Sequence, residues 1–215
     1  MQRTLYKTVY FVRHGESEGN GKGVYQFPHS PLTEKGRAQV ELVAKRLKSI
    51  PFDIVISSTL HRAKETAVII TKHTGHDIVY SELFQEVRRP SVIMGKSIED
   101  PEVIKIKKEI KEHYTDESWR HSDEEHFALL KVRAQQALRF ILDRPEANIL
   151  VVTHGEILCA LMSAMAFEDS LTGDIVQKLN HTFAVFNTGI TKVEYSNFGW
   201  YVITWNDNAH LGEVK

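Results

Sequence analysis

The chain has 215 residues, of which 42% are hydrophobic and 26% are charged, and its formal net charge is -1. This size and composition are typical of one globular domain with a sizeable core, so we expect a single domain over residues 1–215. The near-zero net charge gives no general attraction to nucleic acid or to an anionic membrane. Selectivity for an anionic ligand must therefore come from locally placed residues.

The sequence also indicates a cellular compartment. Cys159 is the single cysteine, so no internal disulfide is expected. No apolar run approaches the ~20 residues that cross a bilayer. Residues 1–4 lead into a strand-like segment without the apolar stretch of a signal peptide. We expect a soluble cytoplasmic protein with no membrane partner and no nucleic-acid partner.

A buried strand and an amphipathic helix are predicted near the N-terminus. Residues 9–12 are β-branched or aromatic and stop at a charged segment that contains glycine, as a strand ending in a loop does. Thr33 is a suitable N-cap for a helix with apolar side chains at i, i+3, i+4 and i+7 spacing. Pro51 lies just beyond the end of that helix.

The same order of strand and helix then repeats. Residues 54–56 predict a second buried strand, and Ser58 or Thr59 can cap the helix that follows it. Gly75 ends this helix, and residues 78–80 predict a third strand.

The second half of the chain continues the alternation. Residues 98–144 are expected to be mostly helical, residues 149–153 give the strongest pattern of a parallel strand, and residues 157–165 predict a further helix. Three C-terminal segments are predicted strands: residues 183–186, 191–195 and 200–205. This order predicts a three-layer α/β/α fold with a mainly parallel central sheet and possible antiparallel edge strands.

Polar residues gather where the predicted parallel strands end. The first strand is followed by Arg13 and His14. The second strand leads into a helix whose first turn carries Arg62, and the strongest strand is followed by His154. Glu86 follows the third strand by a few residues. Because ligands of such folds bind outside the carboxyl ends of the strands, we expect these five residues to lie together.

Arg62 is informative because a cation in the first turn of a helix is disfavoured by the helix dipole, typically by ~0.3–1 kcal/mol. A phosphate bound at the helix N-terminus would compensate, since helix-end amides and a guanidinium group both favour that dianion. The alternative is a solvated arginine on the surface.

His14 and His154 are each followed by glycine, which lets the backbone approach a ligand closely and donate its amide to an oxyanion. One histidine after a strand is usually an ordinary loop residue. Two histidines in the same setting favour a functional role.

With these residues the sequence resembles the histidine phosphatase superfamily, also called phosphoglycerate mutase-like. The matching motifs are spread along the chain: Val12-Arg13-His14-Gly15-Glu16-Ser17 with Asn20, Pro31-Leu32-Thr33 with Gly36, Ser57-Ser58 with Arg62-Ala63 and Thr66, the segment Glu125 to Arg133, and Thr153-His154-Gly155. Their order, spacing and strand context make the resemblance specific.

The resemblance implies a role for each residue of the cluster. His14 would be the nucleophile that attacks phosphorus and becomes phosphorylated, which requires a neutral imidazole. The equatorial phosphoryl oxygens would be bound by Arg13, Arg62 and His154, with Asn20 and the Gly155 amide as further contacts. Because these groups supply positive charge, we expect neither a metal ion nor a cofactor.

One carboxyl group could protonate the leaving oxygen and then deprotonate the attacking water. The resemblance assigns this role to Glu86, with Glu82 as the nearby competitor. Residues 87–90 depart from the family's usual continuation, so the resemblance does not define the substrate pocket. Arg88 and Arg89 in that segment either bind a second anionic group of the substrate or are simply solvated.

We therefore predict a metal-independent phosphomonoester phosphatase that acts on a small phosphorylated metabolite through a phosphohistidine. One alternative is a phosphoglycerate mutase, which returns the phosphoryl group to a second hydroxyl. The other is an inactive module that binds a phosphorylated ligand. Histidines paired elsewhere, His73 with His76 and His121 with His126, match no zinc pattern, and we interpret them as solvated side chains.

Overall fold

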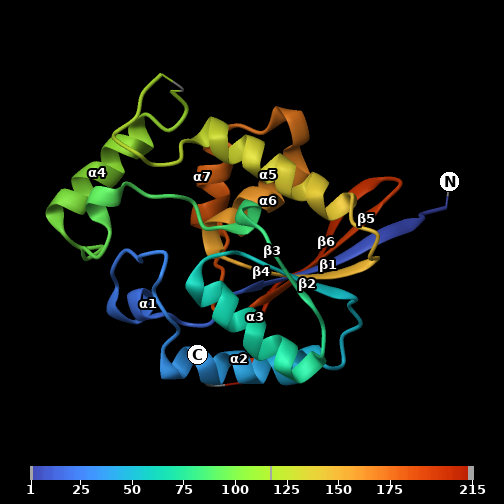
Figure 1. Ribbon diagram of the computed structural model, residues 1–215. Helices are drawn as coiled ribbons and strands as arrows, with labels where there is room; N and C mark the ends of the chain where they lie inside the picture. The colour runs from blue at the N-terminus through green and yellow to red at the C-terminus, as the bar shows by residue number, and fades with distance from the viewer. Residues whose placement is uncertain (1, 117, 213–215) are drawn as a thin grey trace.

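A single six-stranded sheet forms the centre of the computed structural model, which describes residues 2–116 and 118–212. The strand order is β3-β2-β4-β1-β5-β6 (Figure 1). The strands are β1 (Leu5–Arg13), β2 (Ile54–Ser57), β3 (Ile78–Tyr80), β4 (Asn148–Thr153), β5 (Ile190–Ser196) and β6 (Gly199–Asp207). The first four run parallel, whereas β5 and β6 are antiparallel at one edge. This confirms the predicted fold class and its antiparallel edge strands.

Helices cover both faces of the sheet. They are α1 (Glu18–Lys22), α2 (Glu34–Leu47), α3 (His61–Thr74), α4 (Pro101–Glu112), α5 (Phe127–Leu142), α6 (Gly155–Phe167) and α7 (Gly173–Thr182). In Figure 1, α2 and α3 lie below the sheet, and α5 and α6 lie above it. The molecule therefore has the predicted three layers.

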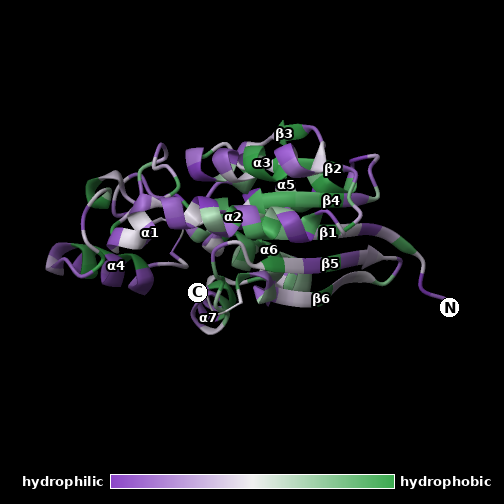
Figure 2. Cartoon of the chain, turned by 90° about the horizontal axis from the view of Figure 1, so that it is seen from below, coloured by the Kyte–Doolittle hydropathy of each residue, from purple (hydrophilic) through white to green (hydrophobic). Residues whose placement is uncertain are grey.

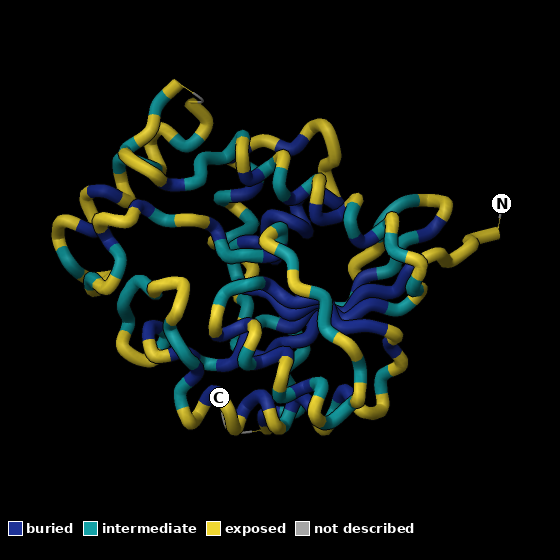
Figure 3. The backbone as a smooth tube through the Cα atoms, viewed as in Figure 1, coloured by how far each residue is buried: buried dark blue, intermediate teal, exposed yellow. Residues whose placement is uncertain are grey.

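The core consists of two apolar clusters that the sheet separates. Val9 and Phe11 point to the side of α5 and α6, while Tyr10 and Val12 point to the side of α2 and α3. In Figure 2, β4 is apolar along most of its length, and Figure 3 shows that the central strands are largely buried. Both faces of β2 and β4 and of the inner part of β1 are covered, which explains their uninterrupted apolar runs, whereas the edge strand β3 is only partly buried.

Helix α4 lies apart from the sheet (Figure 1). It packs through Val103 and Ile106 on Ile93, and the partly buried Tyr25 and Met94 join this small cluster. Because Tyr25 and Met94 also line the cleft described below, α4 supports one wall of that cleft.

The expectation of a strand over residues 183–186 is wrong. Helix α7 extends to Thr182, and a loop follows it as far as β5. Two carbonyl groups of this loop bind side chains instead of a neighbouring strand: the Trp205 indole donates to Ala184 at 3.0 Å, and the Arg13 guanidinium donates to Val185. Short apolar runs do not distinguish a strand from a loop that contacts a cleft.

The long helical segment is confirmed only in part. Residues 98–144 contain α4 and α5, but the chain between these helices is irregular, and residue 117 lies outside the described residues. Among the residues that the structure describes, no helix is long and apolar enough to span a membrane. The cytoplasmic location stays a prediction.

The segment after β1 lies directly against the start of α2. Thr33 caps α2, as predicted, because its Oγ1 accepts from the Gly36 amide at 2.9 Å. A Cβ atom on Gly36 would lie 1.9 Å from the Glu16 carbonyl oxygen, and one on Gly15 would lie 2.6 Å from the Gly36 carbonyl oxygen. Both glycines are needed for this close approach of two backbones.

We expect Gly36→Ala to lower the free energy of unfolding by about 1–3 kcal/mol, because the added methyl group must push apart two backbone segments. Activity should fall with stability, since the displaced segment begins at His14. Gly21→Ala in α1 is the matched control, because its nearest neighbour would be 3.6 Å away. Urea denaturation of both variants measures the effect, and equal stability would contradict it.

Candidate active site

Three strand ends bring their polar residues together. His14 follows β1, and its amide donates to the Thr153 carbonyl of β4 at 3.0 Å. His154 follows β4, and its ring centroid lies 4.9 Å from that of His14. Arg62 is the second residue of α3, and its Nε lies 3.1 Å from His14 Nε2.

Hydrogen bonding determines which ring nitrogen of His14 carries the proton. Its Nδ1 lies 2.7 Å from the Gly15 carbonyl oxygen, which can only accept, so Nδ1 carries the proton. The lone pair is then on Nε2, which accepts from Arg62 Nε. The side chain is buried, and burial, followed by the charges of Arg62 and Arg13, holds the pKa of His14 well below 6.5. His14 is therefore a neutral imidazole with one unprotonated nitrogen.

Arg62 is not a solvated surface arginine, because it is only 3% exposed. Burial lowers the pKa of Arg62 to about 10, so the side chain remains a cation at neutral pH. Its helix does not begin with the predicted cap. Leu60 is the N-cap of α3, while the Ser58 hydroxyl accepts from the Leu60 amide at 3.2 Å and lies 2.8 Å from His154 Nε2. Ser58 is thus used to orient His154.

Buried donors without a protein partner surround this cluster. Within the described residues, Arg62 Nη1, Arg13 Nε and His154 Nδ1 are buried and make no hydrogen bond. Leaving such atoms unpaired costs stability unless a ligand satisfies them. Their proximity to His14 makes an oxyanion the fitting ligand, because guanidinium groups donate strongly to phosphate oxygens.

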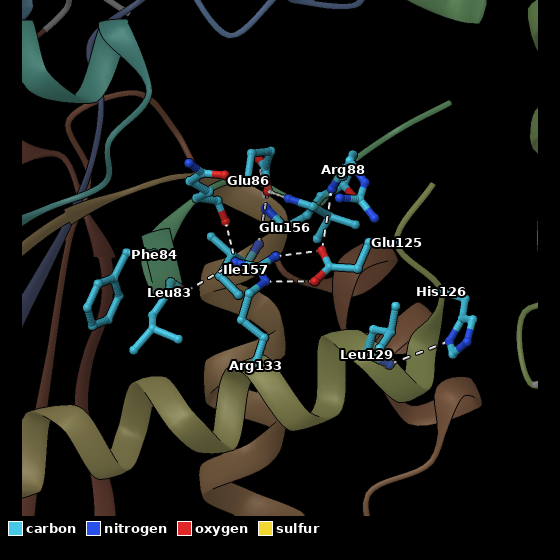
Figure 4. Close-up of polar contacts among 12 residues, drawn as sticks. Leu83, Phe84, Glu86, Arg88, Glu125, His126, Leu129, Arg133, Glu156 and Ile157 are labelled. Atoms are coloured by element: carbon cyan, nitrogen blue, oxygen red, sulfur yellow. Dashed lines mark hydrogen bonds and ion pairs between the residues drawn. The ribbon is translucent and has the colours of Figure 1, made fainter. Parts of the chain in front are cut away.

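Glu86 follows a short 3₁₀ turn, Glu82–Phe84, and lies at the start of α6 (Figure 4). Its Oε1 accepts from the amides of Val87 at 2.9 Å and Ile157 at 3.1 Å, and its Oε2 accepts from the Glu156 amide at 3.3 Å. Burial, followed by the charge of Glu156, raises the pKa of Glu86 above its usual value. A carboxyl group with a raised pKa can act as a proton donor.

Gly155 lies next to both Arg13 and Glu86. A Cβ atom on Gly155 would lie 3.8 Å from Arg13 Nε and 4.0 Å from Glu86 Oε2. The competitor Glu82 also borders the cleft, but it is exposed to solvent. The geometry therefore favours Glu86 over Glu82 as a partner of the cluster.

These residues border a cleft of about 730 Å³. Arg13, His14, Arg62, Glu86 and Gly155 line it, whereas His154 is fully buried behind them. The lining is partly apolar and also contains Val24, Tyr25, Leu60, Met94 and Phe183. The cleft is large enough for a small organic phosphate.

The other predicted binding residues also reach this cleft. Asn20 Oδ1 accepts from the Ser17 hydroxyl at 3.0 Å. Arg89 forms an ion pair with Glu156, and Arg88 is exposed and donates from Nε to the Asp123 carbonyl at 2.8 Å. Neither arginine is simply solvated.

Sequence reasoning gave no role to Glu125, Arg133 or Glu156, which all line the cleft. Glu156 directly follows the Thr153-His154-Gly155 motif, so its proximity to a strand end was available as a signal. Arg133 ends the segment Glu125 to Arg133 that carries part of the resemblance, but nothing in that segment indicated which groups Arg133 contacts.

The remaining histidine pairs serve ordinary contacts. His73 Nε2 lies 2.6 Å from Glu41, the His76 ring packs on Phe52, and His126 caps α5. Within the described part of the chain, no three His, Cys, Asp or Glu side chains gather in a way that could hold a metal ion.

A mainly parallel sheet with histidines and arginines at its carboxyl edge defines the class of α/β proteins that bind ligands where their strands end. The family model described as the histidine phosphatase superfamily (branch 1) matches residues 9–208. The chain therefore belongs to the histidine phosphatase superfamily, and its resemblance at the sequence level is confirmed.

Its relatives are named as phosphatases and as phosphoglycerate mutases. The chain is 31% identical over 221 residues to "Probable phosphoglycerate mutase GpmB" of Salmonella arizonae, with 94% of each chain covered. It is 28% identical over 206 residues to a protein of Schizosaccharomyces pombe named as a probable phosphatase, again with 94% of each chain covered. Among solved structures, YhfR of Bacillus stearothermophilus has a TM-score of 0.80 at 29% identity and covers 95% of this chain and 99% of its own.

We expect the His14 imidazole to stay neutral as the pH falls through 6.5, because its pKa is held well below that value. Arg62→Met removes one cause of the depression, so the pKa of His14 should rise toward 6.5 in this variant. An NMR titration of the ring nitrogens measures both. A titration midpoint for His14 near 6.5 in the wild type would contradict the lowering of its pKa by burial and by the arginines.

Proposed function

We propose that the protein is a metal-independent phosphatase that hydrolyses small phosphomonoesters through a phosphorylated His14. The observation that carries this proposal is the state of His14: a neutral imidazole whose Nδ1 donates to the Gly15 carbonyl and whose unprotonated Nε2 accepts from Arg62 Nε at 3.1 Å. Such a nitrogen need not lose a proton to act as a nucleophile, and its lone pair becomes available when the Arg62 guanidinium donates to a phosphoryl oxygen instead.

In the first step, Nε2 of His14 forms a bond to phosphorus while the bond from phosphorus to the leaving oxygen breaks. Arg62, Arg13 and His154 stabilise the charge on the equatorial oxygens, and their buried setting strengthens these contacts. Asn20 and the Gly155 amide supply further hydrogen bonds. The arginines provide the positive charge that a metal ion provides in other phosphatases.

Glu86 moves the proton in both steps. Its carboxyl group protonates the leaving oxygen in the first step, and the resulting carboxylate then takes a proton from the water that attacks phosphohistidine. The raised pKa of Glu86 favours the protonated form that the first step needs. Arg88 and Arg89 lie further along the cleft, where they contact the remainder of the substrate.

The rival function is a phosphoglycerate mutase, in which phosphohistidine transfers its phosphoryl group to a second hydroxyl. The 31% identity to a relative with that name supports it. We favour hydrolysis because residues 87–90, beside Glu86 on the cleft, depart from the family's usual continuation. Incubation with 3-phosphoglycerate separates the two, because a phosphatase releases inorganic phosphate and a mutase forms 2-phosphoglycerate.

We expect His14→Ala to abolish turnover of p-nitrophenyl phosphate and to abolish an acid-labile, base-stable phosphate that the wild type carries after mixing with substrate. His61→Ala is the matched control, because His61 is an exposed histidine outside the cleft lining. Rapid quenching with ³²P-labelled substrate measures the phosphoenzyme. Equal turnover by wild type and His14→Ala would disprove the proposal.

We expect Glu86→Gln to slow hydrolysis of alkyl phosphates by about 10²-fold and that of p-nitrophenyl phosphate by much less. The reason is that nitrophenolate leaves without protonation. Steady-state kinetics with both substrates measure the difference, and Glu82→Gln is the matched control. A larger effect of Glu82→Gln than of Glu86→Gln would assign the role of proton donor to Glu82.

A further inference from the structure

The segment that carries Glu86 has little regular structure of its own. The 3₁₀ turn ends at Phe84, and the chain then runs through residues 85–90 without helix or strand. Proton transfer requires that a carboxyl group keep its position to well within 1 Å, because small displacements of reacting groups cost large factors in rate. Contacts from other elements must therefore hold this segment.

Arg133 of α5 supplies two of these contacts (Figure 4). Its Nη1 donates to the carbonyl oxygens of Leu83 at 3.1 Å and Gln85 at 2.7 Å. The carbonyl between them, that of Phe84, accepts from the Thr153 hydroxyl of β4 at 2.9 Å. The carbonyl groups of the three residues directly before Glu86 are thus all bound by side chains of α5 and β4.

Glu125 holds the other side of the same segment. Its carboxylate accepts from Arg133 Nε at 2.7 Å and from Arg133 Nη2 at 2.6 Å, in a two-pronged ion pair. The Glu125 amide donates to the Arg88 carbonyl at 2.9 Å, and its Oε2 lies 3.4 Å from the Arg88 amide. Arg133 and Glu125 together bind the chain on both sides of Glu86 (Figure 4).

This pair differs from an ordinary surface ion pair. The side chains of Arg133 and Glu125 are only 17% and 10% exposed, so salt and water screen the contact weakly. A largely buried ion pair adds little net stability, because desolvation offsets its attraction. The planar guanidinium, however, can satisfy a carboxylate and two carbonyl groups at once, which a lysine ammonium cannot do in this geometry.

We propose that Arg133 and Glu125 are positioning residues that hold the Glu86 carboxyl in place for proton transfer. The inference rests on the proposed function, in which Glu86 gives its proton to the leaving oxygen as the bond from phosphorus to that oxygen breaks. In the second step Glu86 takes a proton from water as the bond from phosphorus to His14 breaks. Neither positioning residue exchanges a proton itself.

The test is a leaving-group comparison in Arg133→Lys and Glu125→Gln. In Arg133→Lys we expect kcat for an alkyl phosphate to fall at least about tenfold, with kcat for p-nitrophenyl phosphate and both KM values close to wild type. Glu125→Gln keeps the shape of the side chain and should act in the same direction. Arg144→Lys is the matched control, because Arg144 and Glu146 form a similar two-pronged pair outside the cleft lining.

A double-mutant cycle makes the test specific. If Arg133 acts through Glu86, Arg133→Lys should cause no further loss in a Glu86→Gln background. Equal loss with both substrates, or additive losses in the cycle, would overturn the proposal and leave the pair a purely structural role. If Arg133→Lys fails to fold, the cycle with Glu125→Gln decides by the same criteria.

Failure of the proposed function gives a different result. In that case wild-type turnover is absent or does not depend on His14. Turnover that depends on His14 but is insensitive to Arg133→Lys and Glu125→Gln would reject only the positioning role.

Discussion

The parallel pairing of β1 with β4 is the contact on which the site depends. Arg13 lies opposite Thr153 in this register, and the His14 amide donates to the Thr153 carbonyl. Both strands lie in the middle of the sheet and are buried on both faces, so a shift in register would expose core side chains. Because each strand is followed directly by a histidine, the pairing that satisfies the core also places His14 beside His154.

Burial then determines the charge state of these residues. Two arginines lie next to the two buried imidazoles of His14 and His154. The imidazoles must be neutral, because a buried imidazolium would lose its hydration and be repelled by the arginines. The same burial raises the pKa of Glu86, although three amides bind its carboxyl group. One low-dielectric environment thus leaves a base on His14 and an acid on Glu86, while Arg62 remains a cation.

Much of the fold was predictable because its signals are local. The buried strands of the parallel sheet have uninterrupted apolar runs, and α2 combines a Thr33 cap with a regular apolar face. The failures occurred where local signals are ambiguous. Residues 183–186 are apolar but bind Arg13 and Trp205 through their carbonyls, and Ser58 orients His154 although its residue type suits a helix cap.

The sequence by itself determined the family, the parallel sheet and the convergence of Arg13, His14 and Arg62 near one edge, because short motifs at strand ends encode all three. Only the tertiary structure decided the tautomer of His14, the proximity of Glu86 rather than Glu82 to the cluster, and the contacts of Arg133. The tautomer of His14 depends on how the backbone turns the neighbouring Gly15 carbonyl toward the ring. The other two depend on hydrogen bonds between distant residues, 71 positions apart for Glu86 with Ile157 and 50 for Arg133 with Leu83. No periodicity or spacing in the chain reports such contacts, because they arise only when separate elements pack together.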